Sequence, residues 1–292
     1  MFTKIDTLFR SFAGNFKKIS FYFSLLFNIR IKRADHIDNS VVVSLTSYGE
    51  RVSNSAALAV FSILKQNLSP YAVVLWLDKF KWNDNNLPKS IKYLKKNGLT
   101  VKYCKDIRSY TKLLPALNEY PDKCIVTVDD DVYYSKDMLS ELVNVHIKNP
   151  DAICCLHFCV IRLADNGSLL PYYEWEECHV VPNERIIDQR FIFPQGYGGV
   201  LYPVNVFDES VHDVKHAMEL CPTADDVWFY CMGVKNKKKR AFANNSKTNY
   251  LLVDMFRQLL KKDRLNEANV KIADNNEVQM KRVLDYYNLS II

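Results

Sequence analysis

Residues 124–134 read CIVTVDDDVYY, an apolar, β-branched run that ends on three consecutive aspartates. The run predicts a buried strand, because β-branched residues pack well inside a sheet. Ionised carboxylates repel one another, and their burial is costly unless a cation or hydrogen bonds compensate. Two interpretations follow: either the aspartates bind something positive, or they form a solvated turn.

Strands and helices alternate on both sides of this run. Before it, the pattern predicts strands at 41–48, 72–78 and 100–104 and helices at 53–67, 90–98 and 111–120. After it, we expect a helix at 135–149 and a fifth strand at 152–162. Such alternation is typical of a parallel sheet with right-handed crossovers. The sequence therefore predicts the α/β class, with a mostly parallel, Rossmann-like sheet flanked by helices.

The regular pattern stops after residue 162. Residues 163–195 are aromatic, acidic and Pro-containing, which indicates a long functional excursion. A glycine-rich strand at 196–203 and helices at 223–234, near 249–262 and at 275–288 complete the expected elements. We therefore divide the chain into a basic, amphipathic N-terminal segment (1–40), a central domain (41–245) and a C-terminal helical extension (246–292).

Composition narrows the class of protein. A chain of 292 residues with 48% hydrophobic and 25% charged residues is globular and has room for a large α/β core. The net charge of +6 permits an anionic partner, but we expect no nucleic acid. Eight cysteines without a CxxC pair favour buried free thiols and the reducing cytoplasm over a disulfide framework. The histidine spacing predicts no zinc site.

The N-terminal segment has its own pattern. Aromatic and aliphatic residues spaced by three and four lie on one helical face: Phe9, Phe12, Phe16, Ile19, Phe23 and Leu26. Basic residues surround and follow them: Lys17, Lys18, Arg30, Lys32 and Arg33. The apolar stretch 19–29 is too short to span a bilayer, and no small-residue site predicts signal-peptide cleavage. Two interpretations stay open: a helix lying on an anionic membrane, or a helix packed on its own domain or on a partner subunit.

The position of the aspartates favours binding over a solvated turn. In open parallel sheets, ligands bind beyond the carboxyl ends of the strands. Asp129, Asp130 and Asp131 lie at such an end, and Asp78 follows the second strand. Carboxylates one residue apart converge on a hard divalent cation that keeps positions for phosphate oxygens. The sequence therefore predicts a metal–diphosphate site.

The order of these motifs resembles that of the GT-A glycosyltransferases, and bacterial surface-polysaccharide enzymes are the nearest branch. The resemblance covers about residues 41–245: a Thr/Tyr/Arg turn, an Asp after the second strand, DDD, a Gly-Gly strand and an acidic pair. It implies a GT-A fold and a metal-dependent hexosyltransferase-like enzyme, with Mn²⁺ or Mg²⁺ as cofactor. The implied donor is a nucleotide-sugar, most often a UDP-sugar, and the acceptor a glycan or lipid-linked glycan. The implied pathway is surface polysaccharide synthesis, at the inner face of the plasma membrane.

The resemblance also assigns roles in the donor site. Asp129 and Asp131 match the DxD motif, whose second aspartate is the usual metal ligand and whose first tends toward the ribose or a water. We place Asp130 beside them in the donor site. Lys112 lies where a cation meets the diphosphate as a point charge, although lysines on helices more often face solvent.

Further donor contacts are expected on both sides. Thr46, Tyr48 and Arg51 match the nucleotide-binding turn, and Asp78 matches the position that reads the uracil edge. For Arg51 and Asp78, a surface pair and a simple turn are the alternatives.

The glycine-rich strand has a place in the same expected site. Gly198 and Gly199, with Gly196, would let backbone approach the sugar, and Tyr197 would stack on it. A bulged strand is the alternative. Trp175 and its neighbours make an expected acceptor wall. Many GT-A enzymes add a late histidine ligand, but no histidine follows His216, so water and donor would complete the coordination.

The acidic pair Asp225 and Asp226 opens the helix predicted at 223–234. One interpretation is helix capping, with Thr223 as N-cap and carboxylates favoured by the dipole. The other is catalytic. Inverting transfer needs a carboxylate that takes the proton of the attacking hydroxyl. In the family the second residue of such a pair is the base, which implies this role for Asp226 with Asp225 as its neighbour.

Two other classes compete with this assignment. In a haloacid-dehalogenase-like phosphatase, Asp129 would be the nucleophile and the acidic pair would hold Mg²⁺. That motif normally ends the first strand, whereas three strand–helix units precede it here. The second alternative is a non-catalytic sugar-binding protein on the same fold.

Overall fold

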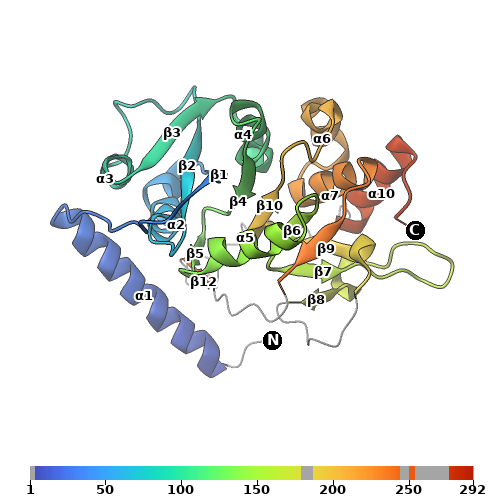
Figure 1. Cartoon of the computed structure of the whole chain (residues 1–292), viewed down its shortest axis with the longest axis horizontal. Coiled ribbons are helices and arrows are strands. Elements are labelled where there is room, and N and C mark those ends of the chain that lie inside the picture. Colours follow the sequence, from blue (N-terminus) through green and yellow to red (C-terminus); the bar gives the residue numbers. More distant parts are fainter. Residues whose placement is uncertain (1–3, 179–186, 244–249, 254–275, 292) are drawn as a thin grey trace.

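The computed structural model describes residues 4–178, 187–243, 250–253 and 276–291. A seven-stranded sheet lies at its centre (Figure 1). Its strands are β1 (Ile37–Thr46), β2 (Ser69–Asp78), β3 (Leu99–Cys104), β4 (Cys124–Thr127), β6 (Ile153–Cys155), β10 (Val200–Tyr202) and β11 (Arg240–Phe242). The order is β11-β6-β10-β4-β1-β2-β3, and only β10 runs antiparallel to its neighbours. The predicted α/β class with a mostly parallel sheet is confirmed.

Helices cover both faces of the sheet. One face packs against α2 (Ser55–Leu64), α3 (Lys89–Lys96) and α5 (Met138–Lys148), and the other against α4 (Leu114–Glu119), α6 (Val214–Leu220), α7 (Asp225–Lys235) and α10 (Asn276–Tyr287). Because strand side chains alternate, Val41 and Val43 enter the first core while Val42 enters the second. All are fully buried. Hydrophobic burial on both faces therefore fixes the register of β1.

The predicted strand at 152–162 is instead two strands in two sheets. After β6 the chain turns at Leu156 and His157, and β7 (Phe158–Val160) joins a three-stranded antiparallel sheet. Its partners are β8 (Glu176–Cys178) and β9 (Ile192–Pro194). Both strands are apolar because both are buried, so the sequence alone does not show the break between them.

The C-terminal helices were predicted with mixed success. The helix at 275–288 is confirmed as α10. The prediction of a helix near 249–262 is wrong for Tyr250–Leu252, because these residues form strand β12. This strand pairs antiparallel with β5 (Val132–Tyr134), which directly follows the three aspartates. The remainder of that predicted helix lies outside the described residues.

Helix α1 (Lys4–Leu26) lies along the outside of the domain (Figure 1). Phe21 is fully buried, with its ring 5.1 Å from Phe61 of α2 and 6.3 Å from Tyr93 of α3. None of the helices in the described part of the chain is both long and apolar enough to cross a bilayer. The contacts of Phe21 show that helix α1 packs on the domain through one face.

The opposite face of α1 is largely uncovered. Its large hydrophobic residues keep much of their surface exposed: Phe16 71%, Ile19 64%, Phe23 55% and Leu26 78%. These four residues belong to the apolar face predicted from the sequence; we call them the exposed stripe.

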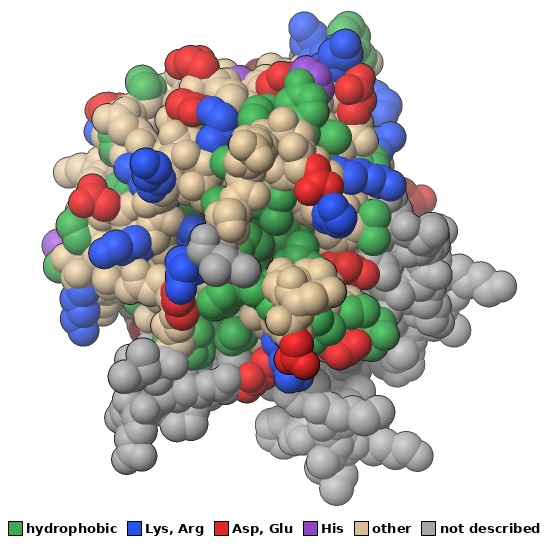
Figure 2. Space-filling model, turned by 90° about the vertical axis from the view of Figure 1, so that its right-hand side faces the viewer, with side chains coloured by type: hydrophobic (Ala, Val, Ile, Leu, Met, Phe, Trp, Pro, Cys, Tyr) green, Lys and Arg blue, Asp and Glu red, His purple; other side chains and the backbone are tan. Residues whose placement is uncertain are grey.

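The described cysteine side chains are free thiols, and the surface carries charges of both signs. Seven cysteines are described as free thiols, and all but Cys104 are buried. On the face of the molecule shown in Figure 2, basic side chains are interspersed with acidic ones. Mixed charge of this kind does not single out a partner for this face.

Candidate functional site

The three aspartates follow β4, which lies beside β1 in the sheet. From β1 the chain order continues to β2 and β3 on one side, while β4 lies on the other side. A sheet of this kind opens a crevice beyond the carboxyl ends where its strand order reverses. The aspartates therefore lie where ligands of α/β proteins usually bind.

Arg51 binds two of the three aspartates at once. Its guanidinium lies 2.7 Å from Oδ1 of Asp130 and 2.8 Å from Oδ2 of Asp131. Ser47 donates a 2.6 Å hydrogen bond to the other oxygen of Asp130. The sequence prediction that Arg51 belongs to the site is consistent with this contact, and Ser47 is an additional member.

Burial shifts the protonation of these groups. It raises the pKa of Asp130 to about 7, although Arg51 and the Ser47 hydroxyl partly oppose the rise. Burial also raises the pKa of Asp131, with a further contribution from Asp129, while Arg51 again lowers it. Repulsion among the carboxylates thus persists, and Arg51 offsets only part of it.

Lys112 joins the first acidic motif to the second. Its ammonium lies 3.0 Å from Asp129, 3.0 Å from Asp225 and 3.9 Å from Asp226. Only 7% of the lysine side chain is exposed, so the prior expectation of a solvent-facing lysine does not hold. Burial lowers the pKa of Lys112, but the surrounding carboxylates outweigh it and the net pKa lies well above its usual value. The ammonium therefore stays charged.

The backbone of Lys112 is fixed to the central strands. Lys112 ends a 3-10 helix over Arg108–Lys112. Ser44 of β1 donates a 2.6 Å hydrogen bond to the Lys112 carbonyl, and Trp76 of β2 donates to the Ser44 hydroxyl. Strand residues thus set the place of the ammonium.

Asp226 lies in the first turn of α7, close to the glycine-rich segment. Its Oδ2 accepts a 2.9 Å hydrogen bond from the Gly196 N–H. A Cβ on Gly196 would come within 2.8 Å of both Asp226 Oδ1 and Lys112 Nζ. Burial raises the pKa of Asp226, Lys112 opposes this, and Asp225 and Asp129 add to it. A carboxyl with a raised pKa is a better proton acceptor when ionised.

Helix capping by Thr223 is a wrong prediction. The N-cap residue is Ala224, which makes no side-chain cap. The Thr223 hydroxyl instead accepts a hydrogen bond from Gln279 of α10. The acidic pair therefore faces Lys112 and Gly196 at a helix start that Thr223 does not cap.

Tyr134 is a site residue that sequence reasoning missed. Its hydroxyl accepts a 2.8 Å hydrogen bond from the Asp129 N–H and donates to the Tyr197 carbonyl at 3.0 Å. The ring is buried, so the hydroxyl joins the acidic motif to the glycine segment away from solvent. The only available signal was its position three residues after Asp131 in DDDVYY.

Three expected donor residues have their contacts in the described part of the chain with partners other than the three aspartates. The Thr46 hydroxyl donates to the Trp76 carbonyl, which ties β1 to β2. Asp78 accepts from the Phe80 N–H and lies 3.4 Å from Lys81, so it forms a turn. Tyr48 is 59% exposed, and its ring centre lies 5.5 Å from the Arg51 guanidinium. Of the three, only Tyr48 presents a surface beside Arg51 on which a base could stack.

The glycine segment is shaped by close packing. A Cβ on Gly198 would lie 2.5 Å from His157, and Gly199 adopts a φ of +89°, which favours glycine. Trp175 is only 5% exposed, and its indole donates to the Leu170 carbonyl. The expectation of Trp175 as an acceptor wall is therefore wrong, because this side chain is part of the core.

Two carboxylates of the site are available as ligands for a divalent ion. Asp129 and Asp131 keep 32% and 23% of their side chains exposed, so an ion can reach them. Among the described residues, no three acidic, histidine or cysteine side chains gather as a complete ligand set. Mg²⁺ is commonly held by one or two carboxylates together with substrate phosphates and waters. The residues thus fit an ion that arrives with a diphosphate.

No protein-family model matches the chain, and no curated protein matches it. Among solved structures, it is similar to the mannosyltransferase PcManGT from Pyrobaculum calidifontis in complex with GDP-Man and Mn²⁺ (16% identity, TM-score 0.32, 53% of this chain and 46% of that one). It is also similar to S. aureus TarS 1-349 (13%, TM-score 0.46, 85% and 72%). A third is UTP-bound UGPase from Acinetobacter baumannii (9%, TM-score 0.40, 85% and 93%). Likeness at this level assigns no function, and the chain spans less than half of the mannosyltransferase.

Proposed function

We propose that this chain is a glycosyltransferase that moves a sugar, with inversion, from a UDP-sugar to a hydroxyl of a glycan or lipid-linked glycan. The contact that carries the proposal is the placement of Lys112 between Asp129 and Asp225, 3.0 Å from each. It brings the aspartate motif after β4 and the acidic pair of α7 to one place. Sugar transfer needs these two parts together: charge stabilisation of the departing diphosphate, and a base for the attacking hydroxyl.

The donor end of the site combines carboxylates with fixed cations. Arg51 and Lys112 are held by ion pairs and offer positive charge where a diphosphate would lie. Tyr48 beside Arg51 offers an exposed ring for the base. Thr46, Asp78, Gly198 and Gly199 are also proposed to contact the nucleotide-sugar. They would do so through their backbone atoms and by shaping the site.

A divalent ion, Mn²⁺ or Mg²⁺, is part of the proposal. Asp129 and Asp131 would hold it, and when bound it would neutralise charge on the leaving diphosphate. Asp130 serves a different purpose, since its two oxygens are bound by Arg51 and Ser47. It fixes the turn after β1 against the end of β4.

Asp226 is the proposed base. The Gly196 N–H orients one carboxylate oxygen, and Lys112 lies 3.9 Å from the other. Ionised Asp226 would take the proton as the acceptor hydroxyl attacks the anomeric carbon. Asp225, bound by the ammonium of Lys112, holds that lysine beside the base.

We also propose that α1 rests on anionic lipid, which would bring the enzyme to lipid-linked acceptors at the inner face of the plasma membrane. The exposed stripe supplies apolar area, and exposed Lys17, Arg30 and Lys32 lie on or just after the helix. Each basic residue near an anionic surface contributes about 1 kcal/mol.

A calorimetric donor screen tests the proposal. Full-length protein is titrated with UDP-glucose, UDP-galactose, their N-acetyl forms and GDP-mannose, each with Mn²⁺ and again with EDTA. We expect one UDP-sugar to bind in Mn²⁺ and to bind far more weakly in EDTA. Binding of none of them, with or without metal, would overturn the assignment.

A further inference from the structure

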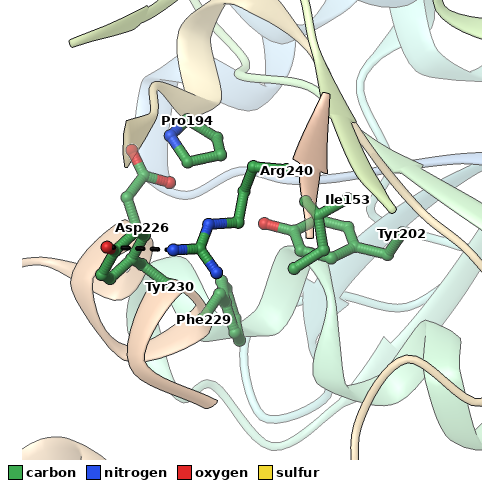
Figure 3. Close-up of a pocket in the computed structure, with 7 residues that line it drawn as sticks. All are labelled: Ile153, Pro194, Tyr202, Asp226, Phe229, Tyr230 and Arg240. Carbon is green, nitrogen blue, oxygen red and sulfur yellow. Dashed lines mark hydrogen bonds between the residues drawn. The ribbon is translucent and has the colours of Figure 1, made fainter. Parts of the chain in front are cut away.

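A small cavity lies beside the proposed base, on the side of α7 that faces the sheet (Figure 3). It is lined by Ile153, Pro194, Tyr202, Asp226, Phe229, Tyr230 and Arg240. Its volume of about 10 Å³ is close to the smallest space that holds one water molecule. The lining mixes apolar walls with three kinds of polar group: a carboxylate, hydroxyls and a guanidinium.

Arg240 is the buried cation of this cavity. It begins β11 and is only 4% exposed. One terminal nitrogen donates to the Lys238 carbonyl at 2.7 Å, and the other donates to the Arg190 carbonyl and the Tyr230 hydroxyl. Its Nε, in contrast, has no hydrogen-bond partner among the described residues. A buried N–H without a partner is rare and destabilising, so it points to a ligand.

We propose that the cavity binds one ordered water molecule, which accepts a hydrogen bond from Arg240 Nε and donates one to the Asp226 carboxylate. The two side chains line the same cavity, and Figure 3 shows the Asp226 carboxylate turned toward the side where the guanidinium lies. Buried waters make two to four hydrogen bonds, and the Tyr202 hydroxyl, which points toward Arg240 in Figure 3, offers a third partner.

This water makes Arg240 a positioning residue for Asp226. Tyr230 lies one turn after Asp226 in α7, and the Arg240 guanidinium stacks over its ring at 4.6 Å. Arg240 and Tyr230 both donate to the Arg190 carbonyl, which fixes this turn of α7 against the chain leading into β9. Arg240 thus holds the helix directly and the carboxylate through the water. The catalytic consequence rests on the proposed function, whereas the water site does not.

Crystal structures of the full chain and two variants test the water site. In wild type we expect a water within about 3.2 Å of Arg240 Nε and of an Asp226 oxygen. Arg240→Gln places its amide nitrogen where Nε stands and keeps the water. Arg240→Lys places a CH₂ group there and loses it, and Asp226 then changes its side-chain torsion. A dry wild-type cavity, or a water that persists unchanged in Arg240→Lys, overturns the proposal.

Transfer kinetics test the positioning role separately. With the donor found by the screen, Arg240→Lys should lower kcat by roughly 10-fold or more and leave the donor KM unchanged, since misplaced catalytic groups slow the chemical step. Arg162→Lys is the matched control, because it makes the same change at an exposed arginine. If the water is present but kcat is unaffected, the positioning role is refuted and the proposed function stands. If Asp226→Asn is also fully active, the assignment of Asp226 as the base fails, and if wild type transfers sugar from none of the donors, the proposed function itself fails.

Discussion

The ammonium of Lys112 lies 3.0 Å from the Asp225 carboxylate, and this ion pair connects two acidic motifs from opposite halves of the chain. The same ammonium contacts Asp129 at the end of β4. Each motif alone is a common turn or helix start. Their shared cation is what turns them into one site.

Removal of this cation should strongly destabilise the protein. Lys112→Met leaves Asp129, Asp225 and Asp226 without their counter-ion, and breaking a buried ion pair costs about 3–5 kcal/mol. Urea unfolding measures the loss. Lys89→Met, at an exposed position of α3, is the control and should behave as wild type. Adding Asp225→Asn to Lys112→Met should restore part of the stability, and a purely additive double variant would contradict the shared-cation interpretation.

Asp226→Asn should separate binding from chemistry. The amide cannot take a proton from the acceptor, so transfer should fall by roughly 10² to 10⁴-fold. Calorimetric binding of the UDP-sugar should persist, since Asp129 and Asp131 are intact. Wild-type turnover in this variant would show that the acidic pair has a structural role and no catalytic one. A product of retained anomeric configuration would separately exclude the inverting mechanism.

Asp131→Asn should weaken the metal-dependent part of donor binding. The variant loses one of two carboxylates available to the ion, while Arg51 keeps its contact with Asp130. We expect turnover to be abolished and UDP-sugar binding in Mn²⁺ to fall toward its value in EDTA, while the protein still folds and unfolds in one cooperative transition. Asp122→Asn, whose side chain is 74% exposed, is the matched control. EDTA-insensitive activity in Asp131→Asn would refute the metal site.

Asp130 should give the protein a defined pH dependence of stability. Its folded pKa is raised by burial to about 7, above that of an unfolded aspartate near 3.9. Between these values the folded state binds more protons than the unfolded state, so this group's contribution to stability falls as pH rises from about 4 to 7. Asp130→Asn removes the titration. Its stability relative to wild type should therefore improve over this window, by at most about 4 kcal/mol. Parallel urea curves that keep a constant difference from pH 4 to pH 8 would contradict this.

The exposed stripe of α1 should govern contact with lipid. Full-length protein should sediment with anionic liposomes at low salt, and the combined change Phe16→Ser, Phe23→Ser and Leu26→Ser should release it. Ile147→Ser on α5 removes an equally exposed hydrophobic side chain and should have no effect. Deletion of residues 1–35 is a poorer test, because it would also remove buried Phe21 from the core. Release of wild type and triple variant to the same extent would refute the membrane proposal.

The sequence predicted the parts of the fold that repeat a simple period. Alternating strands and helices through β4 were recognisable because their hydrophobic patterns are regular. The break at His157 was not, since β6 and β7 are equally apolar and only their different sheets distinguish them. β12 depends on pairing with β5, a long-range contact that no local pattern encodes.

The candidate site shows the same division. The DDD motif and the acidic pair were visible as residue types at strand and helix ends. Their partners were only partly visible: Arg51 and Lys112 carry charge, but Ser47 and Tyr134 are ordinary residues whose hydroxyls become important through tertiary contact. Trp175 was misassigned because an aromatic in a polar segment looks exposed, whereas it packs against Phe193.

The antiparallel strand β10 has a consequence for how the chain is made. It inserts between β4 and β6, so residues 200–202 complete the centre of a sheet whose other half is built from residues 37–127. On the ribosome, β1 to β4 emerge first and leave β4, whose four residues are all buried in the folded protein, as an open edge until β10 arrives. Unpaired edges of this kind recruit other strands. The growing chain is therefore most exposed to misassembly during synthesis of the segment between β4 and β10, and a chaperone that shields the β4 edge would act in that interval.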